Sequence, residues 1–233
     1  MSWSEPDGIA PRGTLIVIPG RGEQPELYER FGRRVSFDGY RVHAVTDPTQ
    51  DATLALSQVS AQLAGPAPLV LVGSDTGALF AVGLVVSGQA AGVDALVLAG
   101  LPAATEAAPV GWDAELESRT ACPTHRARLA GTALRRGALY DPVPEGWAAL
   151  ADLSAVAQPV LGIHGADDPV SPLDAARPRY ASAPHADLVS ITGGKHDALN
   201  DATHRTVAAT VVEFLERLRL GPGLPAIATR EAL

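Results

Sequence analysis

The chain has 233 residues, of which 46% are hydrophobic and only 5% are aromatic. This length suits one α/β domain, and the composition means that alanine, valine and leucine must build most of its core. Acidic residues outnumber basic ones by 26 to 18, and the formal charge of −8 argues against nucleic acids or anionic membranes as partners. Cys122 is the only cysteine, which excludes an internal disulfide bond.

The compartment is inferred from features that the sequence lacks. Residues 1–7 have neither the basic nor the apolar region of a signal peptide, and no apolar run reaches the length of a transmembrane helix. We therefore expect a cytoplasmic protein. Lys195 is the only lysine beside many arginines, a bias typical of GC-rich bacterial genes.

Strand and helix patterns alternate along the chain. In chain order we expect a strand over 14–18, a helix over 25–38, a strand over 40–45, a helix over 52–63, a strand over 69–73, a helix over 77–86, strands over 94–99, 159–164 and 186–191, and a helix over 201–218. This alternation predicts an α/β fold with a doubly wound, mostly parallel sheet of about six core strands. So few residues precede the first strand that any additional antiparallel hairpin must be short or missing.

Residues 101–158 interrupt the alternation with helical pieces near 113–118, 124–136 and 145–155. The segment lies between two strands, on the side where an α/β sheet binds ligands. We therefore predict a hydrolase-like core over 1–100 and 159–220, a helical lid insertion over 101–158 and a flexible tail over 221–233. The alternative is an ordinary helical excursion without substrate contacts.

The most informative segment is a buried strand that leads into a tight turn and a helix. Residues 69–78 read Leu-Val-Leu-Val-Gly-Ser-Asp-Thr-Gly-Ala, a Gly-x-nucleophile-x-Gly pattern. Gly73 and Gly77 set its register and put Asp75, rather than Ser74, at the nucleophile position. Because such a turn presents one side chain at the carboxyl edge of the sheet, the pattern predicts a carboxylate nucleophile.

Two further groups follow later strands. Asp167 and Asp168 come after the strand that ends at His164, and His196 comes after the last strand in Gly-Gly-Lys-His-Asp. Because the carboxyl ends of parallel strands meet at one edge, these side chains are candidates for a single site. No group of histidines and acids has metal-ligand spacing, and no dinucleotide or phosphate loop is present, so we expect neither a metal nor an organic cofactor.

In the order and spacing of these three motifs the chain resembles the α/β-hydrolases, from about residue 14 to residue 218. The resemblance implies that His196 is a general base and that Asp168 orients it, with Asp167 as the substitute. It also implies that the backbone amides of Arg21 and Thr76 form an oxyanion hole. The Arg21 guanidinium could instead bind a substrate carboxylate, or be a solvated surface charge.

Within this fold, haloalkane dehalogenases, fluoroacetate dehalogenases and epoxide hydrolases use an aspartate nucleophile. The resemblance therefore implies a covalent aspartyl ester, formed on a small organic substrate with a carbon–halogen bond, an epoxide or a related electrophile, and hydrolysed by water. Trp112, Tyr140 and Trp147 of the lid segment are candidate substrate-binding residues. The segment has one tyrosine, so the two-tyrosine arrangement of epoxide hydrolases cannot form there.

Three other functions remain open at this point. Asp75 could be a base in a lyase, isomerase or cyclase. Ser74 could be the nucleophile of an esterase or thioesterase after a shift of register. The chain could also be a non-catalytic ligand-binding protein, because a fold does not fix a function. The sequence leaves the substrate and the oligomeric state undetermined.

Overall fold

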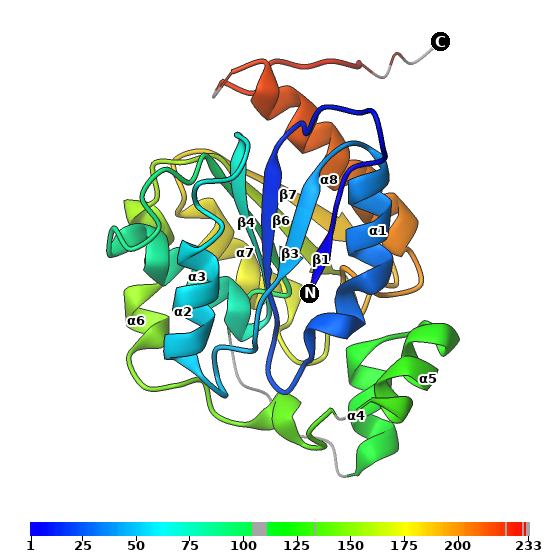
Figure 1. Cartoon of the computed structure of the whole chain (residues 1–233). Helices are drawn as coiled ribbons and strands as arrows, with labels where there is room; N and C mark the ends of the chain where they lie inside the picture. The colour runs from blue at the N-terminus through cyan, green and yellow to red at the C-terminus, as the bar shows by residue number, and fades with distance from the viewer. Residues whose placement is uncertain (104–110, 133, 222, 230, 232–233) are drawn as a thin grey trace.

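The structure is a computed structural model that describes residues 1–103, 111–132, 134–221, 223–229 and 231. In this part of the chain a seven-stranded sheet runs through the middle, with helices on both faces (Figure 1). The strand order is β1-β3-β2-β4-β5-β6-β7, and only β1 is antiparallel to its neighbour. The strands are β1 (Ser2–Trp3), β2 (Thr14–Ile18), β3 (Arg41–Ala44), β4 (Leu69–Ser74), β5 (Ala95–Ala99), β6 (Val160–Gly165) and β7 (Ala186–Ile191). The predicted α/β fold with a doubly wound, mostly parallel sheet is confirmed.

The helices divide between the two faces of the sheet. Helices α1 (Glu29–Phe37) and α8 (His204–Arg219) share one apolar cluster with the sheet. Helices α2 (Ala52–Ser60), α3 (Thr76–Val86) and α7 (Leu173–Ala181) share the cluster on the opposite face. Figure 1 shows the two groups on either side of the strands.

Strand β2 shows why the sheet needs both layers. All five of its residues are buried, and they alternate between the faces, with Leu15 and Val17 in one cluster and Ile16 and Ile18 in the other. A strand that is covered on both sides reads as a continuous apolar run, which is why this element is predictable to the residue. It lies next to β4, and Ile18 pairs with Gly73 just before the predicted nucleophile.

Two elements were not predicted. Strand β1 has only two residues, of which Trp3 packs against Gly32 of α1, so the additional antiparallel strand is short. Helix α7 contains Pro178 and buries only Ala176 and Tyr180, so it lacks the apolar stripe that indicates a helix. Its Tyr180 packs closely against Gly162 of β6, where a Cβ atom would lie 2.7 Å from the ring.

Where the structure describes it, the segment between β5 and β6 consists of short helices joined by loops. In chain order these are α4 (Trp112–Arg119), α5 (Pro123–Gly131), the 3₁₀ turn η2 (Ala138–Tyr140), α6 (Trp147–Leu150) and the 3₁₀ turn η3 (Leu153–Ala155). Helices α4 and α5 lie together at one end of the molecule, and α6 lies beside α3 (Figure 1). The part of the predicted lid over 104–110 is outside the described residues, and the role of the whole segment as a lid stays a prediction.

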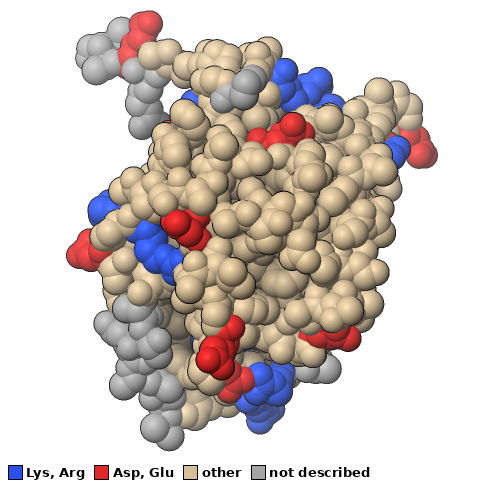
Figure 2. Space-filling model, turned by 90° about the vertical axis from the view of Figure 1, so that its left-hand side faces the viewer, with Lys and Arg blue, Asp and Glu red and all other residues tan. Residues whose placement is uncertain are grey.

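The face over α2, α3 and α6 is seen in Figure 2, where charged side chains form small, separate groups of both signs. A groove in this part of the molecule runs between α3 and α6 and is lined mainly by apolar residues, among them Leu79, Phe80, Trp147 and Leu150. Trp147 packs there against Phe80, with the ring centroids 5.1 Å apart.

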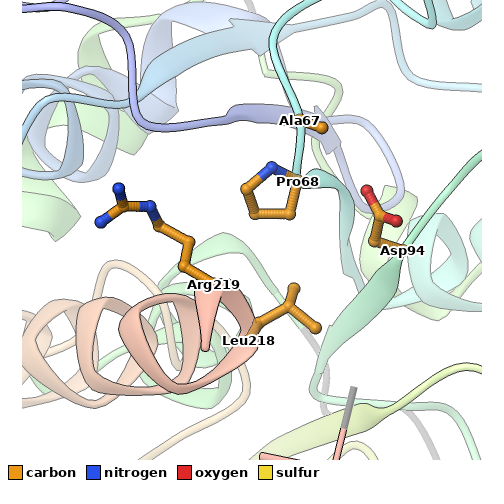
Figure 3. Close-up of a pocket in the computed structure, with 5 residues that line it drawn as sticks. All are labelled: Ala67, Pro68, Asp94, Leu218 and Arg219. Carbon is orange, nitrogen blue, oxygen red and sulfur yellow. The ribbon is translucent and has the colours of Figure 1, made fainter. Parts of the chain in front are cut away.

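A cavity of about 400 Å³ lies at the amino ends of β4 and β5. Figure 3 shows its lining, in which Pro68 and Asp94 face Leu218 and Arg219 at the end of α8. Because Asp75 follows the carboxyl end of β4, this cavity lies at the opposite edge of the sheet from the predicted nucleophile. It is therefore not part of the site described below.

Candidate active site

The backbone at Asp75 forms a sharp turn between β4 and α3. Asp75 has φ 49° and ψ −125°, a conformation that non-glycine residues rarely adopt and that costs on the order of 1–3 kcal/mol. The turn is tight because α3 begins one residue later, at Thr76. The start of this helix lies directly against the loop that follows β2. A Cβ atom on Gly77 would lie 2.2 Å from the carbonyl oxygen of Ile18, so only glycine fits there.

The Asp75 carboxylate is buried and held by Arg21 from two directions. Its Oδ2 accepts hydrogen bonds from the backbone amide of Arg21 at 3.0 Å and from Nε of the same residue at 2.8 Å. Its Oδ1 accepts a third from Nη2 at 2.7 Å. The loop that carries Arg21 can approach this closely because residue 20 is glycine. A Cβ atom at Gly20 would lie only 2.8 Å from Cβ of Asp75. The side chains of Arg21 and Asp75 are 8% and 4% exposed, so the pair is almost fully shielded from water.

His196 lies on the other side of the carboxylate. Its Nε2 is 3.4 Å from Oδ1 of Asp75 and makes no hydrogen bond with any described residue, although it is buried. Its Nδ1 is 2.8 Å from Oδ2 of Asp168. The structure therefore brings Asp75, His196 and Asp168 into one chain of contacts, while Asp167, the next residue, is exposed.

Asp168 is fixed by its own surroundings. Its Oδ1 accepts the backbone amides of Val170 at 2.8 Å and Ser171 at 3.0 Å. Behind it, Nε2 of His164 lies 3.3 Å from Oδ2 and 2.6 Å from the carbonyl oxygen of Ser171. The His164 ring is fully buried, and its Nδ1 lies 3.2 Å from the hydroxyl oxygen of Tyr180.

The charges in this group stabilise one another. Burial raises the pKa of Asp75, but the charge and hydrogen bonds of Arg21, together with the charge of the nearby His196 ring, outweigh burial and hold that pKa well below its usual range. Burial likewise opposes ionisation of Asp168, and His196 and His164 reverse its effect, so the pKa of Asp168 is lowered. For His196 burial favours the neutral ring, yet the Asp168 and Asp75 carboxylates raise its pKa to about 10. At neutral pH the resting site therefore contains two carboxylates, the Arg21 guanidinium and an imidazolium.

Comparison with known proteins identifies the fold. No protein-family model matches the chain, and no curated protein matches it. A soluble variant of monoglyceride lipase from Saccharomyces cerevisiae, solved with a substrate analogue, superposes with a TM-score of 0.72 and 16% identity over 93% of this chain and 90% of that one. The monoacylglycerol lipase of Paleococcus ferrophilus superposes with a TM-score of 0.70 and 15% sequence identity, over 92% of this chain and 96% of the lipase. An esterase from Exiguobacterium antarcticum superposes with a TM-score of 0.66 and 16% sequence identity, over 93% of this chain and 94% of the esterase.

The chain has the α/β-hydrolase fold. At identities near 16% the likeness establishes the fold, and the chemistry must be argued from the residues of the site.

Within this α/β-hydrolase fold, the loop that carries Arg21 follows β2, and its role as an oxyanion loop stays a prediction. The Arg21 amide points at Oδ2 of Asp75. Thr76 is the first residue of α3 and is fully buried, and its hydroxyl has no partner among the described residues. Of the two alternatives for the Arg21 side chain, the solvated surface charge is wrong, because the guanidinium is buried against Asp75, and the binding of a substrate carboxylate stays a prediction. The contribution of the Thr76 amide to the oxyanion hole stays a prediction.

The three candidate substrate-binding residues lie in different surroundings. Burial raises the pKa of Tyr140, and its hydroxyl is buried without a partner in the described structure. Trp112 packs against the apolar cluster and is covered by Arg136, whose Cζ is 5.1 Å from the ring centroid. Trp147 lies in the groove beside α3, which none of Asp75, His196 and Asp168 lines.

Sequence reasoning missed a buried group of charges next to the site, formed by Glu23, Glu115, Arg119 and Asp197. Arg119 is the last residue of α4, and nothing in its local sequence distinguishes it from an exposed helix-terminal arginine. The only available signal was the position of Glu23 and Asp197, each close in sequence to a predicted site residue.

Among the described residues, no group of three or more histidines, cysteines and acids has the arrangement of a metal site. The helices that the structure describes also include none that combines the length and the apolar character needed to cross a bilayer.

Proposed function

We propose that this chain is a hydrolase that acts on a small organic electrophile through a covalent ester on Asp75. The observation that carries the proposal is the position of the Asp75 carboxylate, with Oδ1 3.4 Å from Nε2 of His196 and Oδ2 at the Arg21 amide. The lipases and the esterase that share its fold support the hydrolase class by their names. The carboxylate at the elbow favours a carbon–halogen bond, an epoxide or a related group as the target.

In the first step an Oδ1 lone pair of Asp75 attacks an sp³ carbon of the substrate. The new carbon–oxygen bond forms as the bond to the leaving group breaks, and the leaving group departs with the electron pair as a halide or an alkoxide. Oδ2 is the oxygen that keeps its donors, because it accepts both the amide and Nε of Arg21. Oδ1 carries one bond from Arg21 Nη2 and retains a lone pair on the side that faces His196.

In the second step water attacks the Cγ carbon of Asp75 while Nε2 of His196 takes a proton from that water. Negative charge develops on Oδ2, and the two donors of Arg21 lie where they can stabilise it. Collapse of the tetrahedral intermediate releases the alcohol with its bond to Oδ1 intact, and His196 returns the proton to it. The carboxylic acid left on Asp75 then gives the second proton of the water to His196, and the regenerated carboxylate contains one oxygen from water.

The order of these steps fits the charges of the site. His196 is protonated at rest because Asp168 and Asp75 raise its pKa to about 10. Formation of the ester removes the charge of Asp75 and with it one cause of that increase. The ring can then lose its proton, to an alkoxide leaving group or to solvent, and becomes a base only after the ester exists.

An esterase that uses Ser74 is the second candidate, favoured by the names of the structural neighbours. Ser74 is the last residue of β4, and its hydroxyl lies beside that of Tyr28. In this arrangement His196 has Asp75, rather than Ser74, as its neighbour. A cytoplasmic location, and partners limited to small molecules without nucleic acid or membrane, remain part of the proposal.

Single turnover in ¹⁸O-labelled water separates the candidates. The purified chain is mixed in excess with styrene oxide, 1-bromobutane or 4-nitrophenyl acetate, and the peptide that contains Asp75 is weighed. An aspartyl ester that is hydrolysed at Cγ leaves the label in this peptide, and Asp75→Asn abolishes turnover while Ser74→Ala does not.

Turnover of 4-nitrophenyl acetate that is lost in Ser74→Ala, with no label in the peptide, would support the esterase instead. Turnover that needs Asp75 but never labels it would indicate that the carboxylate acts as a base. Binding of these probes without any turnover would indicate a ligand-binding protein.

A further inference from the structure

Arg119 is a fully buried arginine outside the three predicted catalytic motifs. It ends α4, and its side chain is 1% exposed. A guanidinium carries five N–H donors in a rigid fork, so it can join several acceptors at fixed angles. Because the side chain is buried, protein groups must supply acceptors for these donors.

The first set of partners belongs to the loop that carries Arg21. Nη2 of Arg119 donates to the carbonyl oxygen of Arg21 at 3.0 Å, and Nη1 donates to Oε1 of Glu23 at 3.3 Å. The other carboxylate oxygen of Glu23 accepts the backbone amide of Gly20 at 2.9 Å. The Arg119 guanidinium therefore contacts Arg21 directly and reaches Gly20, the preceding residue, through Glu23.

The second set of partners belongs to the loop that carries His196. Nη1 of Arg119 is 3.7 Å from Oδ1 of Asp197, the residue after the histidine. The backbone continues the connection, because the Asp197 amide donates to the Arg119 carbonyl at 2.8 Å and the His196 amide donates to the Ser118 carbonyl at 3.3 Å. The end of α4 thus holds the histidine loop through its main chain and through its side chain.

Glu115 completes the surroundings of the guanidinium from within α4. Its Oε1 accepts from both Nε and Nη2 of Arg119 at 3.2 Å. Three acidic side chains, those of Glu23, Glu115 and Asp197, consequently surround one cation in a buried space. A lysine could keep the charge there, but its single ammonium could not make the same forked contacts.

We propose that Arg119 is a positioning residue that holds the Arg21 loop and the His196 loop at a fixed separation on either side of Asp75. The inference rests on the proposed function, since only a reaction at Asp75 gives this separation a catalytic purpose. Misplacement of reacting groups by about 1 Å can slow a reaction on the order of 10²-fold, so such a clamp matters for turnover more than for substrate affinity.

The test compares Arg119→Lys with Arg128→Lys in the full chain. Arg128 lies in the next helix, α5, and pairs with Glu29 at 2.6 Å in a partly exposed contact, so it is a matched control for the substitution itself. The first readout is the pH titration of the His196 ring, followed by NMR with ¹⁵N-labelled histidine, and it does not depend on any substrate. Because lysine keeps the positive charge, a change in this titration reports a change in position.

We expect Arg119→Lys to lower the pKa of His196 by about one unit or more as the ring moves away from the carboxylates, and Arg128→Lys to leave it unchanged. With a substrate found in the labelling experiment, kcat should fall by about tenfold or more in Arg119→Lys while KM stays within about twofold. A folded Arg119→Lys protein with an unchanged His196 titration would overturn the proposal, whatever reaction the chain catalyses.

Should Arg119→Lys not fold, hydrogen exchange of the unmodified protein gives the answer. The Gly20 amide donates to Glu23, which the Arg119 guanidinium contacts, and the Asp197 amide donates to the Arg119 carbonyl oxygen, so both loops depend on this residue. If Arg119 couples the loops, the two amides open together and their protection factors agree within about threefold. Protection factors that differ by more than about tenfold would mean that the loops open independently and that the clamp does not exist.

Discussion

The guanidinium of Arg21 spans both carboxylate oxygens of Asp75, with Nε 2.8 Å from Oδ2 and Nη2 2.7 Å from Oδ1. Both side chains are buried, and the backbone amide of the same arginine also points at Oδ2. In the proposed mechanism one residue thus supplies both an amide of the oxyanion hole and a permanent positive charge beside it. The charge keeps Asp75 ionised, and at the same time it occupies one lone pair of the oxygen that must attack.

This double role predicts different effects of Arg21 on the two chemical steps. Arg21→Met keeps the backbone amide and removes the guanidinium. Loss of one donor to the developing oxyanion should slow hydrolysis of the aspartyl ester by about 10²-fold or more. Formation of the ester should be slowed less, so that the covalent intermediate accumulates and can be detected by mass spectrometry of the intact protein after rapid quenching. Equal slowing of both steps would mean that the side chain only keeps Asp75 charged.

The two neighbouring acids of the β6 loop offer a matched pair of variants. Asp168→Asn removes the carboxylate that contacts Nδ1 of His196 at 2.8 Å, and kcat should fall by about 10³- to 10⁴-fold because the ring loses its orientation and its charge partner. Asp167→Asn changes an exposed side chain and should leave kcat within about twofold, a difference too small to indicate a catalytic role. A large loss in Asp167→Asn would reverse this assignment.

The sequence predicts those parts of the fold and site that depend on local pattern. Strand β2 is recognisable because both faces of its five residues are buried, and the elbow is recognisable because glycines flank Asp75 where the backbone has no room for Cβ atoms. Helix α7 has no apolar stripe to reveal it. The contacts of Arg119 join residues that are 96 and 98 positions apart, and no local pattern encodes such a contact. The same limit explains why the burial of the Arg21 side chain was not foreseen.

The raised pKa of His196 predicts how stability depends on pH. Its value of about 10 in the folded chain lies above the 6.5 expected when the chain is unfolded, so the folded state binds the proton more tightly. The resulting stabilisation is fully present below about pH 6.5 and is lost as the pH rises toward 10. Each unit of difference corresponds to about 1.4 kcal/mol of unfolding free energy.

Urea unfolding of the wild type and of His196→Gln at intervals from pH 6 to pH 10 measures this effect. The wild type should lose stability relative to the variant across that range, by more than about 1 kcal/mol. A constant difference between the two proteins would mean that the imidazole is neutral in the folded state. It would then be available as a base before any ester forms, contrary to the order of steps proposed above.

Two glycines of α3 test whether the elbow depends on close backbone contact. A Cβ on Gly77 would lie 2.2 Å from the carbonyl oxygen of Ile18, whereas a Cβ on Gly83 would have the Cβ of Leu150 as its nearest neighbour, at 3.9 Å. Gly83→Ala should therefore stabilise the protein by about 0.5–1 kcal/mol, because alanine has the higher helix propensity. Gly77→Ala must displace either β2 or the start of α3, and we expect it to destabilise the protein by about 2 kcal/mol or more.

The free energies of unfolding of both variants can be measured in urea. The displacement of α3 should also move Asp75 away from His196, so Gly77→Ala should lose the shift in the His196 titration that Gly83→Ala retains. Equal stability of the two variants would show that the turn has room for a side chain, and the register that puts Asp75 at the nucleophile position would lose its physical basis.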